Sequence, residues 1–287
     1  MSKQVATIHF EKWPELLMIA RHGYSVANER KDNARAAGKE AAWNGITRDQ
    51  DAELTPLGHQ QAYSLGVMIG LSGEKGFDDD LPEVIITSPY LRAKQTTAGI
   101  VRGIQSVLPT YNPRIVVEER IREIEFGVMD GIDRKRFREL YPMEADRRER
   151  DGKYYFRPPG GENRPDVRLR VHSVLDTLNR DYVGMRVLIV CHSVVVLAFR
   201  SLIERWEEEE YLKVDKEDDC KNCGLTVYRR IFKRKLELGE YNLVAPLVEI
   251  PVPPTQVNKY PDHVEPDVND YESRGMRDRD IGIGWPK

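Results

Sequence analysis

Short apolar runs alternate along the chain with stretches in which apolar residues recur at helical spacing. The runs at 16–20, 84–87 and 187–191 contain no charged residue, which is typical of strands buried on both faces of a sheet. We expect helices near 55–71, 90–106, 133–141, 164–180 and 193–206, and two later strands near 224–231 and 241–248. Buried strands that alternate with helices predict an α/β fold, here a three-layer α/β/α sandwich with a mostly parallel central sheet.

The composition of the chain changes once, near residue 250. From there to the last residue the chain is rich in Pro, Asp and Arg and poor in aliphatic residues. Such a segment cannot bury much apolar surface, so we expect an extended tail. The predicted organisation is one domain at residues 1–249 followed by a C-terminal extension at 250–287.

Charge and cysteine content exclude several classes of protein. The 287 residues include 44 Lys and Arg and 47 Asp and Glu, for a net charge of −3, so there is no general attraction to nucleic acid or to an anionic membrane. No apolar run is long enough to span a bilayer, and the N-terminus lacks the pattern of a secretory signal. Three cysteines suit a reducing compartment better than a disulfide framework. We therefore predict a cytoplasmic protein without a nucleic-acid or membrane partner.

Polar residues that could carry chemistry follow each of the three buried strands. Arg21 and His22 follow the first strand, Arg92 lies shortly after the second, and His192 follows the third. Ligands of α/β sheets collect beyond the carboxyl ends of the strands. A single histidine after a strand is more often a structural residue, but four such residues at one edge of the sheet indicate a site.

Two arginines and two histidines suit the transfer of a phosphoryl group. Guanidinium groups bind phosphate oxygens in a bidentate way and keep their charge, and a neutral imidazole can attack phosphorus. The leaving oxygen then needs a proton, ideally from a carboxyl group with a raised pKa. The segment at 121–127 offers Glu123 and Glu125, and the residues alone do not choose between them.

Six blocks of the sequence resemble, in order, the motifs of the histidine phosphatase superfamily, also called the phosphoglycerate mutase-like family. The blocks are RHGYSVAN (21–28), LTPLGHQQA (54–62), TSPYLRAKQT (87–96), IREIEFGVMDG (121–131), PPGGENRPDV (158–167) and VLIVCHSVVVL (187–197). They span about residues 15–230. The resemblance implies the phosphoglycerate mutase-like fold and an enzyme that works without a metal or another cofactor.

The same resemblance implies a phosphohistidine mechanism. His22 would attack phosphorus and hold the phosphoryl group covalently, while Arg21, Arg92 and His192 would bind the phosphoryl oxygens. Glu123 aligns with the acid of the family's motif and would protonate the leaving alcohol and later activate water. The other ring nitrogen of His22 is expected to bond to the backbone near Gly23, which would select one tautomer.

Three further residues are candidates for binding the substrate. Asn28 would add a hydrogen bond to the phosphate. Ser193 stands where the family commonly has glycine, and would offer its backbone N–H. Arg157 belongs to a basic and aromatic cluster at 147–157 and would contact the part of the substrate beyond the phosphate. A solvated helix end followed by an extended strand is the alternative interpretation of that cluster.

Two insertions distinguish the chain from a minimal member of the family. Extra residues near 29–53 are expected to lengthen a loop over the site, and a cap insertion is expected near 132–160. Mutases of the family that depend on a bisphosphate cofactor carry a longer cap. A shorter cap leaves the phosphohistidine open to water, which favours hydrolysis of a small phosphate ester. Mutase-type phosphoryl transfer and a phosphate-binding regulatory protein without turnover remain alternatives, and self-association is left open.

Overall fold

A six-stranded sheet forms the centre of the computed structural model, which describes residues 12–38, 48–74, 81–232 and 235–250. The strands are β1 (Leu16–Arg21), β2 (Val84–Thr87), β3 (Arg114–Val117), β4 (Arg186–Cys191), β5 (Leu225–Ile231) and β6 (Lys235–Leu243). They lie in the order β3-β2-β4-β1-β5-β6, and β5 runs antiparallel to both of its neighbours. The predicted mostly parallel sheet is confirmed.

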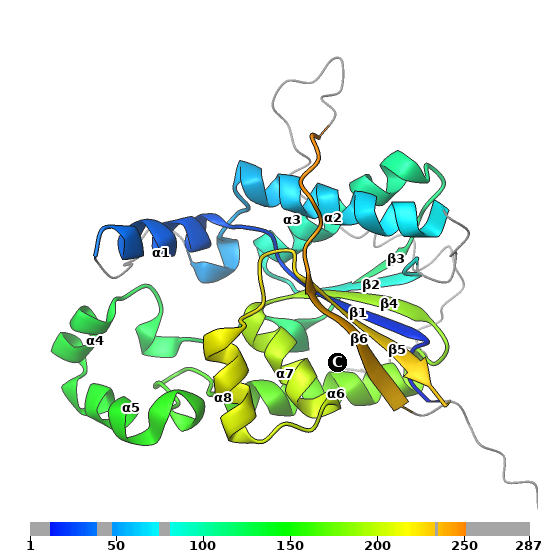
Figure 1. Cartoon of the computed structure of the whole chain (residues 1–287). Helices are drawn as coiled ribbons and strands as arrows, with labels where there is room; N and C mark the ends of the chain where they lie inside the picture. The colour runs from blue at the N-terminus through cyan, green and yellow to red at the C-terminus, as the bar shows by residue number, and fades with distance from the viewer. Residues whose placement is uncertain (1–11, 39–47, 75–80, 233–234, 251–287) are drawn as a thin grey trace, which may run out of the picture.

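Helices cover both faces of the sheet (Figure 1). The helices are α1 (Val26–Ala36), α2 (Pro56–Glu74), α3 (Leu91–Val107), α4 (Arg134–Leu140), α5 (Pro142–Tyr155), α6 (Arg164–Asp181), α7 (Ser193–Ile203) and α8 (Glu208–Glu217). The α2 and α3 helices lie on one face, and α6 and α7 lie on the other. The three-layer α/β/α sandwich is therefore confirmed. None of the helices in the described ranges is long and apolar enough to cross a bilayer.

The two faces of the sheet carry separate hydrophobic cores. In β1, Leu17 and Ile19 belong to the core beneath α6 and α7, while Leu16 and Met18 belong to the core beneath α2 and α3. This alternation follows from the two-residue period of a strand. Because both faces are buried from Leu16 to Ala20, each of these residues is apolar, which explains the uninterrupted run at 16–20.

The last strand lies earlier in the chain than its sequence pattern predicts. The prediction of 241–248 is wrong, since β6 ends at Leu243. Beyond it the chain passes along α2, where Val248 N–H donates to Ser64 Oγ at 2.9 Å and Gln60 Nε2 donates to the Val248 carbonyl at 3.2 Å. Helix side chains thus satisfy the backbone groups that a strand would have paired with a neighbour. Residues 251–287 of the predicted extension lie outside the described residues.

The two insertions are more helical than expected. Residues 29–36 of the loop expected near 29–53 belong to α1, whose start is stabilised by a capping box between Ser25 and Asn28. Residues 39–47 of that loop lie outside the described residues. The basic and aromatic cluster belongs mainly to α5, which continues to Tyr155 with a break at Gly152, so an extended strand there is wrong. The α4 and α5 helices lie at the same end of the sheet as α1 (Figure 1).

Close packing of α2 on α3 depends on glycine. A Cβ atom on Gly66 would lie 2.1 Å from the Ile100 carbonyl oxygen, whereas a Cβ on Gly70 would lie 3.1 Å from the Val107 side chain. We expect Gly66→Ala to lower the free energy of unfolding by about 3 kcal/mol, because backbone of the facing helix must move. Gly70→Ala, on the same helix, is expected to stay within about 1 kcal/mol, since its gain in helix propensity offsets the tighter contact. Urea unfolding measures both variants, and equal stabilities would contradict this account of the helix contact.

Candidate active site

The ends of β1, β2 and β4 bring their following residues to one edge of the sheet. Arg21 pairs with Cys191 in the register of β1 and β4. Two backbone hydrogen bonds continue this alignment, from His22 N–H to the Cys191 carbonyl at 2.9 Å and from Ser88 N–H to the Val190 carbonyl at 3.0 Å. The rings of His22 and His192 lie 5.2 Å apart, centre to centre. The predicted convergence of the two histidines is therefore present.

His22 is buried and held in one tautomer. Its Nδ1 lies 2.8 Å from the Gly23 carbonyl oxygen, which can only accept, so Nδ1 carries the proton and Nε2 carries the lone pair. Burial lowers the pKa of His22 well below its ordinary value, and the nearby Arg92 and Arg21 lower it further. The imidazole is consequently neutral and nucleophilic near neutral pH.

The local backbone around His22 requires glycine at the next position. A Cβ on Gly23 would lie 2.6 Å from the carbonyl oxygen of Gly58 at the start of α2. The Gly23 N–H donates to Thr96 Oγ1 of α3 at 2.9 Å. Gly23, the residue after His22, is therefore packed between α2 and α3. This packing fixes the backbone that carries the His22 ring.

Arg92 lies in the first turn of α3 and contacts the nucleophilic nitrogen. Its Nε donates to His22 Nε2 at 3.2 Å, and its side chain is 3% exposed. The other end of the guanidinium bonds to Asp49, with Nη2 2.8 Å from Oδ2 and Nη1 donating to the Asp49 carbonyl. A fully charged guanidinium is thus in place beside the lone pair of His22.

Ser88 orients the second histidine. Its Oγ lies 2.7 Å from His192 Nε2 and accepts a bond from Tyr90 N–H at 3.3 Å. Among the described residues the hydroxyl hydrogen has no acceptor other than Nε2, so it is directed to that nitrogen. His192 Nδ1 then carries the ring proton and lies 3.8 Å from Glu123 Oε2. Burial, followed by the charge of Arg92, lowers the pKa of His192 well below its ordinary value. This neutral imidazole is a hydrogen-bond donor aimed at the site.

Two buried donors of the cluster have no hydrogen-bond partner among the described residues. They are Arg21 Nε and His192 Nδ1. Arg21 is anchored at its other end, where Nη1 donates to the Cys220 carbonyl. Buried donors without partners are costly. An anion with several oxygen atoms would satisfy both of them.

Glu123 and Glu125 lie in different surroundings. The Glu123 side chain is 13% exposed, and its Oε1 accepts from Ile124 N–H at 2.9 Å. Burial raises the pKa of Glu123, and the charge of Arg92 opposes this only in part. Glu125 is 46% exposed and forms an ion pair with Arg122 at 3.2 Å. Of the two, Glu123 is the carboxyl group beside the histidines.

A second network holds the backbone that carries Glu123. Arg170 of α6 donates from Nη1 to the Arg120 carbonyl at 2.6 Å and from Nη2 to the Glu123 carbonyl at 3.2 Å. The Nε of Arg170 bonds to Glu162 at 3.0 Å, and Glu162 also accepts from Glu125 N–H at 3.0 Å. Arg170 and Glu162 therefore position the loop, although neither is a candidate on sequence grounds.

Asn28 and Ser193 lie at the mouth of this cluster. The Asn28 Oδ1 faces the backbone N–H of Ser25 and Asn222 Nδ2, at 3.1 and 3.3 Å, which leaves its amide nitrogen as a donor. Asn222 also donates to the His22 carbonyl at 3.0 Å and acts as a structural turn residue. Ser193 begins α7, where backbone N–H groups have no partner within the helix and favour anions.

An open cavity of about 880 Å³ leads to these residues. It lies between α1 and the α4 and α5 helices, and Arg21, Asn28, Glu123 and Ser193 are among the residues that line it. Its other charged lining residues are Lys31, Asp32, Arg35, Asp49, Asp130, Asp133, Arg134, Arg148, Lys153, Arg164, Asp215 and Asp219.

Arg157 is not one of the residues that line the cavity. Its Nε donates to Asp166 Oδ2 at 2.7 Å, an ion pair near the start of α6. Arg148 of the same cluster does line the cavity. The structure therefore places the helical Arg148, and not Arg157, where it can face a ligand.

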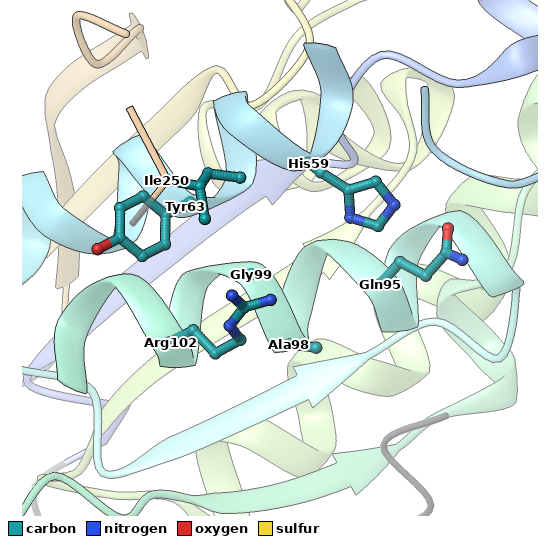
Figure 2. Close-up of a pocket in the computed structure, with 7 residues that line it drawn as sticks. All are labelled: His59, Tyr63, Gln95, Ala98, Gly99, Arg102 and Ile250. Atoms are coloured by element: carbon teal, nitrogen blue, oxygen red, sulfur yellow. The ribbon is translucent and has the colours of Figure 1, made fainter. Parts of the chain in front are cut away.

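A second hollow lies on the outer helical layer, between α2 and α3, and Figure 2 shows the residues that line it. Its volume of about 20 Å³ holds roughly one water molecule. His59 and Arg102 belong to it. It is too small for a substrate. Among the described residues, no three His, Cys, Asp or Glu side chains are grouped as a metal site requires.

Comparison with known proteins places the chain in a family. The model of the histidine phosphatase superfamily (branch 1) matches residues 17–238, which include every residue of the cluster. The chain belongs to the histidine phosphatase superfamily, as its six motifs predict. Its relatives include the phosphoglycerate mutase-like protein AT74H of Arabidopsis thaliana, 25% identical over 72% of each chain. A 2,3-bisphosphoglycerate-dependent phosphoglycerate mutase of Methylobacterium radiotolerans is 31% identical over 62% of this chain and 73% of its own.

Solved structures share the fold. A mycobacterial glucosyl-3-phosphoglycerate phosphatase superposes with a TM-score of 0.57, at 18% identity, over 80% of this chain and 100% of its own. The alpha-ribazole phosphatase of Shigella flexneri superposes with a TM-score of 0.60, at 19% identity, over 82% of this chain and 100% of its own. Phosphatases and mutases therefore both occur among the similar proteins, and the family by itself does not choose between hydrolysis and transfer.

Proposed function

We propose that the protein is a metal-independent phosphomonoesterase that hydrolyses small phosphate esters through a phosphohistidine on His22. One observation carries this proposal. The lone pair of His22 Nε2 lies beside the Arg92 guanidinium, and the two unpartnered donors, Arg21 Nε and His192 Nδ1, belong to the same buried cluster. A nucleophile surrounded by donors suits a phosphoryl group, whose negative charge is spread over its oxygens.

In the first step, Nε2 of His22 attacks phosphorus. The N–P bond forms as the bond from phosphorus to the ester oxygen breaks, and Glu123 gives its proton to the leaving oxygen. Positive charge develops on the imidazole and is stabilised by the Gly23 carbonyl at Nδ1. Arg21, Arg92 and His192 hold the phosphoryl oxygens through the transfer.

In the second step, Glu123 acts as a base. Its carboxylate takes a proton from a water molecule, whose oxygen attacks phosphorus while the N–P bond breaks. The products are inorganic phosphate, neutral His22 and protonated Glu123. A carboxyl group with a raised pKa suits both roles, because it keeps its proton to higher pH than an ordinary carboxyl group and its carboxylate is a stronger base.

Access of water favours hydrolysis over transfer. Residues of α4 and α5 help to line an open cavity of about 880 Å³ that reaches Arg21 and Glu123 of the cluster, which supports the access of water to a phosphohistidine. Mutase-type transfer is the second candidate, and it is favoured by the similarity to the Methylobacterium mutase.

We also infer a small phosphorylated substrate and a cytoplasmic location, the latter supported by three buried, free cysteines.

The test compares phosphate release with isomerisation. We expect the purified protein to release phosphate from 4-nitrophenyl phosphate and from small sugar and glycerate phosphates in the presence of EDTA. We expect no faster conversion of 3-phosphoglycerate to 2-phosphoglycerate when 2,3-bisphosphoglycerate is added. Isomerisation that outpaces phosphate release would support the mutase, and loss of phosphate release in EDTA would exclude the metal-independent mechanism. Phosphate binding without turnover of any ester would support the regulatory protein.

A further inference from the structure

The Asp49 carboxylate forms an ion pair with Arg92, an arginine that the proposed reaction needs for binding phosphate. It lies at the start of a short 3₁₀ helix, Asp49–Asp51, and its carboxylate is 2.8 Å from Nη2 of Arg92. The Asp49 side chain is 15% exposed and lines the cavity. An acidic side chain therefore lies inside a site whose substrate is an anion.

The geometry makes Asp49 and a phosphoryl group competitors. The single guanidinium of Arg92 bonds through Nε to His22 Nε2, at 3.2 Å, and through Nη2 to Asp49 Oδ2. A phosphoryl group close enough for attack by Nε2 would meet the same outer face of the guanidinium. A carboxylate that remained there would repel a phosphate dianion at a separation of a few ångströms, in a site with little solvent screening. The Asp49 carboxylate and a phosphoryl group therefore cannot bind this side of the Arg92 guanidinium at the same time.

The contact also affects the nucleophile. While Asp49 holds the outer nitrogens of Arg92, the Nε–H of Arg92 is directed at the lone pair of His22. That lone pair must be released before Nε2 can attack phosphorus. In the resting arrangement, the Arg92 guanidinium therefore donates a hydrogen bond to the lone pair of His22 and forms an ion pair with the Asp49 carboxylate.

We propose that Asp49 is an internal substitute for phosphate, a carboxylate that a phosphoryl dianion displaces from Arg92. This inference rests on the proposed function, because it takes Arg92 as the phosphate-binding arginine. It also means that every anion that binds Arg92 must first compete with the Asp49 carboxylate. A singly charged anion such as a carboxylate replaces Asp49 with one of equal charge and gains little, whereas a phosphoryl dianion brings more charge to the same guanidinium.

The test measures phosphate binding without turnover. Inorganic phosphate is titrated at pH 8, where it is mainly the dianion, into the full chain and into Asp49→Asn by isothermal calorimetry. Asparagine keeps the size of the side chain and removes its charge. We expect Asp49→Asn to bind phosphate about tenfold more tightly, a difference of about 1.4 kcal/mol. Acetate is titrated in parallel, and its affinity is expected to rise by a similar factor, so that a weak ligand becomes measurable.

Asp51→Asn is the matched control, since Asp51 is an exposed residue of the same 3₁₀ helix. We expect it to bind phosphate like the unaltered protein. Unchanged or weaker binding in Asp49→Asn would overturn the proposal and would make Asp49 a support that positions Arg92. A gain in affinity cannot come from partial unfolding, and Asp49→Ala, which also removes the competing charge, is expected to show the same gain.

The two proposals fail separately. If neither the unaltered chain nor Asp49→Asn binds phosphate at millimolar concentration, the role of Asp49 is overturned, while ester hydrolysis in EDTA still tests the proposed function. If Asp49→Asn binds phosphate more tightly but no ester is hydrolysed, the proposed function is wrong and the competition at Arg92 stands.

Discussion

Replacement of His22 by alanine is expected to lower the rate of phosphate release by at least about a thousandfold with every ester that the protein hydrolyses. The reason is that Nε2 of His22 carries the lone pair that forms the N–P bond, fixed by the bond of Nδ1 to the Gly23 carbonyl. The measurement is steady-state phosphate release in EDTA. Rapid alkaline quenching of the unaltered protein should also trap an acid-labile phosphohistidine that His22→Ala lacks.

His172→Ala is the control for this experiment. His172 lies on α6 with a side chain that is 62% exposed and is 3.5 Å from Asp176, so its loss should leave the rate within about twofold. Thermal unfolding of both variants separates loss of the nucleophile from loss of the fold. A His22→Ala protein that is folded and still releases phosphate at the original rate would exclude the phosphohistidine mechanism.

Glu123→Gln is expected to lower kcat by about 10²–10⁴-fold for an alkyl phosphate, because glutamine can neither protonate the leaving oxygen nor accept a proton from water. The loss should be smaller in the phosphorylation step with 4-nitrophenyl phosphate, whose leaving group needs little protonation. A pre-steady-state burst of nitrophenol would reveal this difference, since the variant would still form the intermediate and then hydrolyse it slowly.

The pH dependence of kcat/KM follows from the surroundings of Glu123 and His22. Burial raises the pKa of Glu123 above its ordinary value, so the protonated form persists to higher pH, and activity should fall as pH rises through that raised pKa. Burial and two arginines lower the pKa of His22, so the acid limb should lie below pH 6.5. Glu123→Gln should lack the alkaline limb with substrates for which protonation of the leaving oxygen limits the rate.

Glu125→Gln provides the matched control. Glu125 lies two residues further along, is half-exposed, and is bonded to Arg122 and to the Tyr90 hydroxyl. We expect it to change kcat by no more than a few-fold and to keep the alkaline limb. An equal loss in both variants would show that the loop, and not the Glu123 carboxyl group, is what the reaction requires.

Local patterns in the sequence determined the centre of the fold. The uninterrupted apolar runs predicted β1, β2 and β4, because a strand buried on both faces must be apolar at every residue. The rule that ligands gather beyond the carboxyl ends of strands then placed His22, Arg92 and His192 together.

Elements at the periphery were harder to predict. The α1 helix has one buried residue, Ala27, so its apolar periodicity is weak and its capping box provides most of the signal.

The sequence by itself therefore determined the family, the sheet with its covering helices and the set of candidate site residues. Tertiary structure decided how those side chains are arranged, because that depends on burial and on contacts between residues far apart in the chain. The residues alone left Glu123 and Glu125 equivalent, and the family motif favoured Glu123. The fold places the Glu123 side chain beside His192, with 13% of it exposed, and leaves 46% of the Glu125 side chain exposed. The contact between Asp49 and Arg92 joins positions 43 residues apart, and no local pattern along the chain encodes a pairing at that separation.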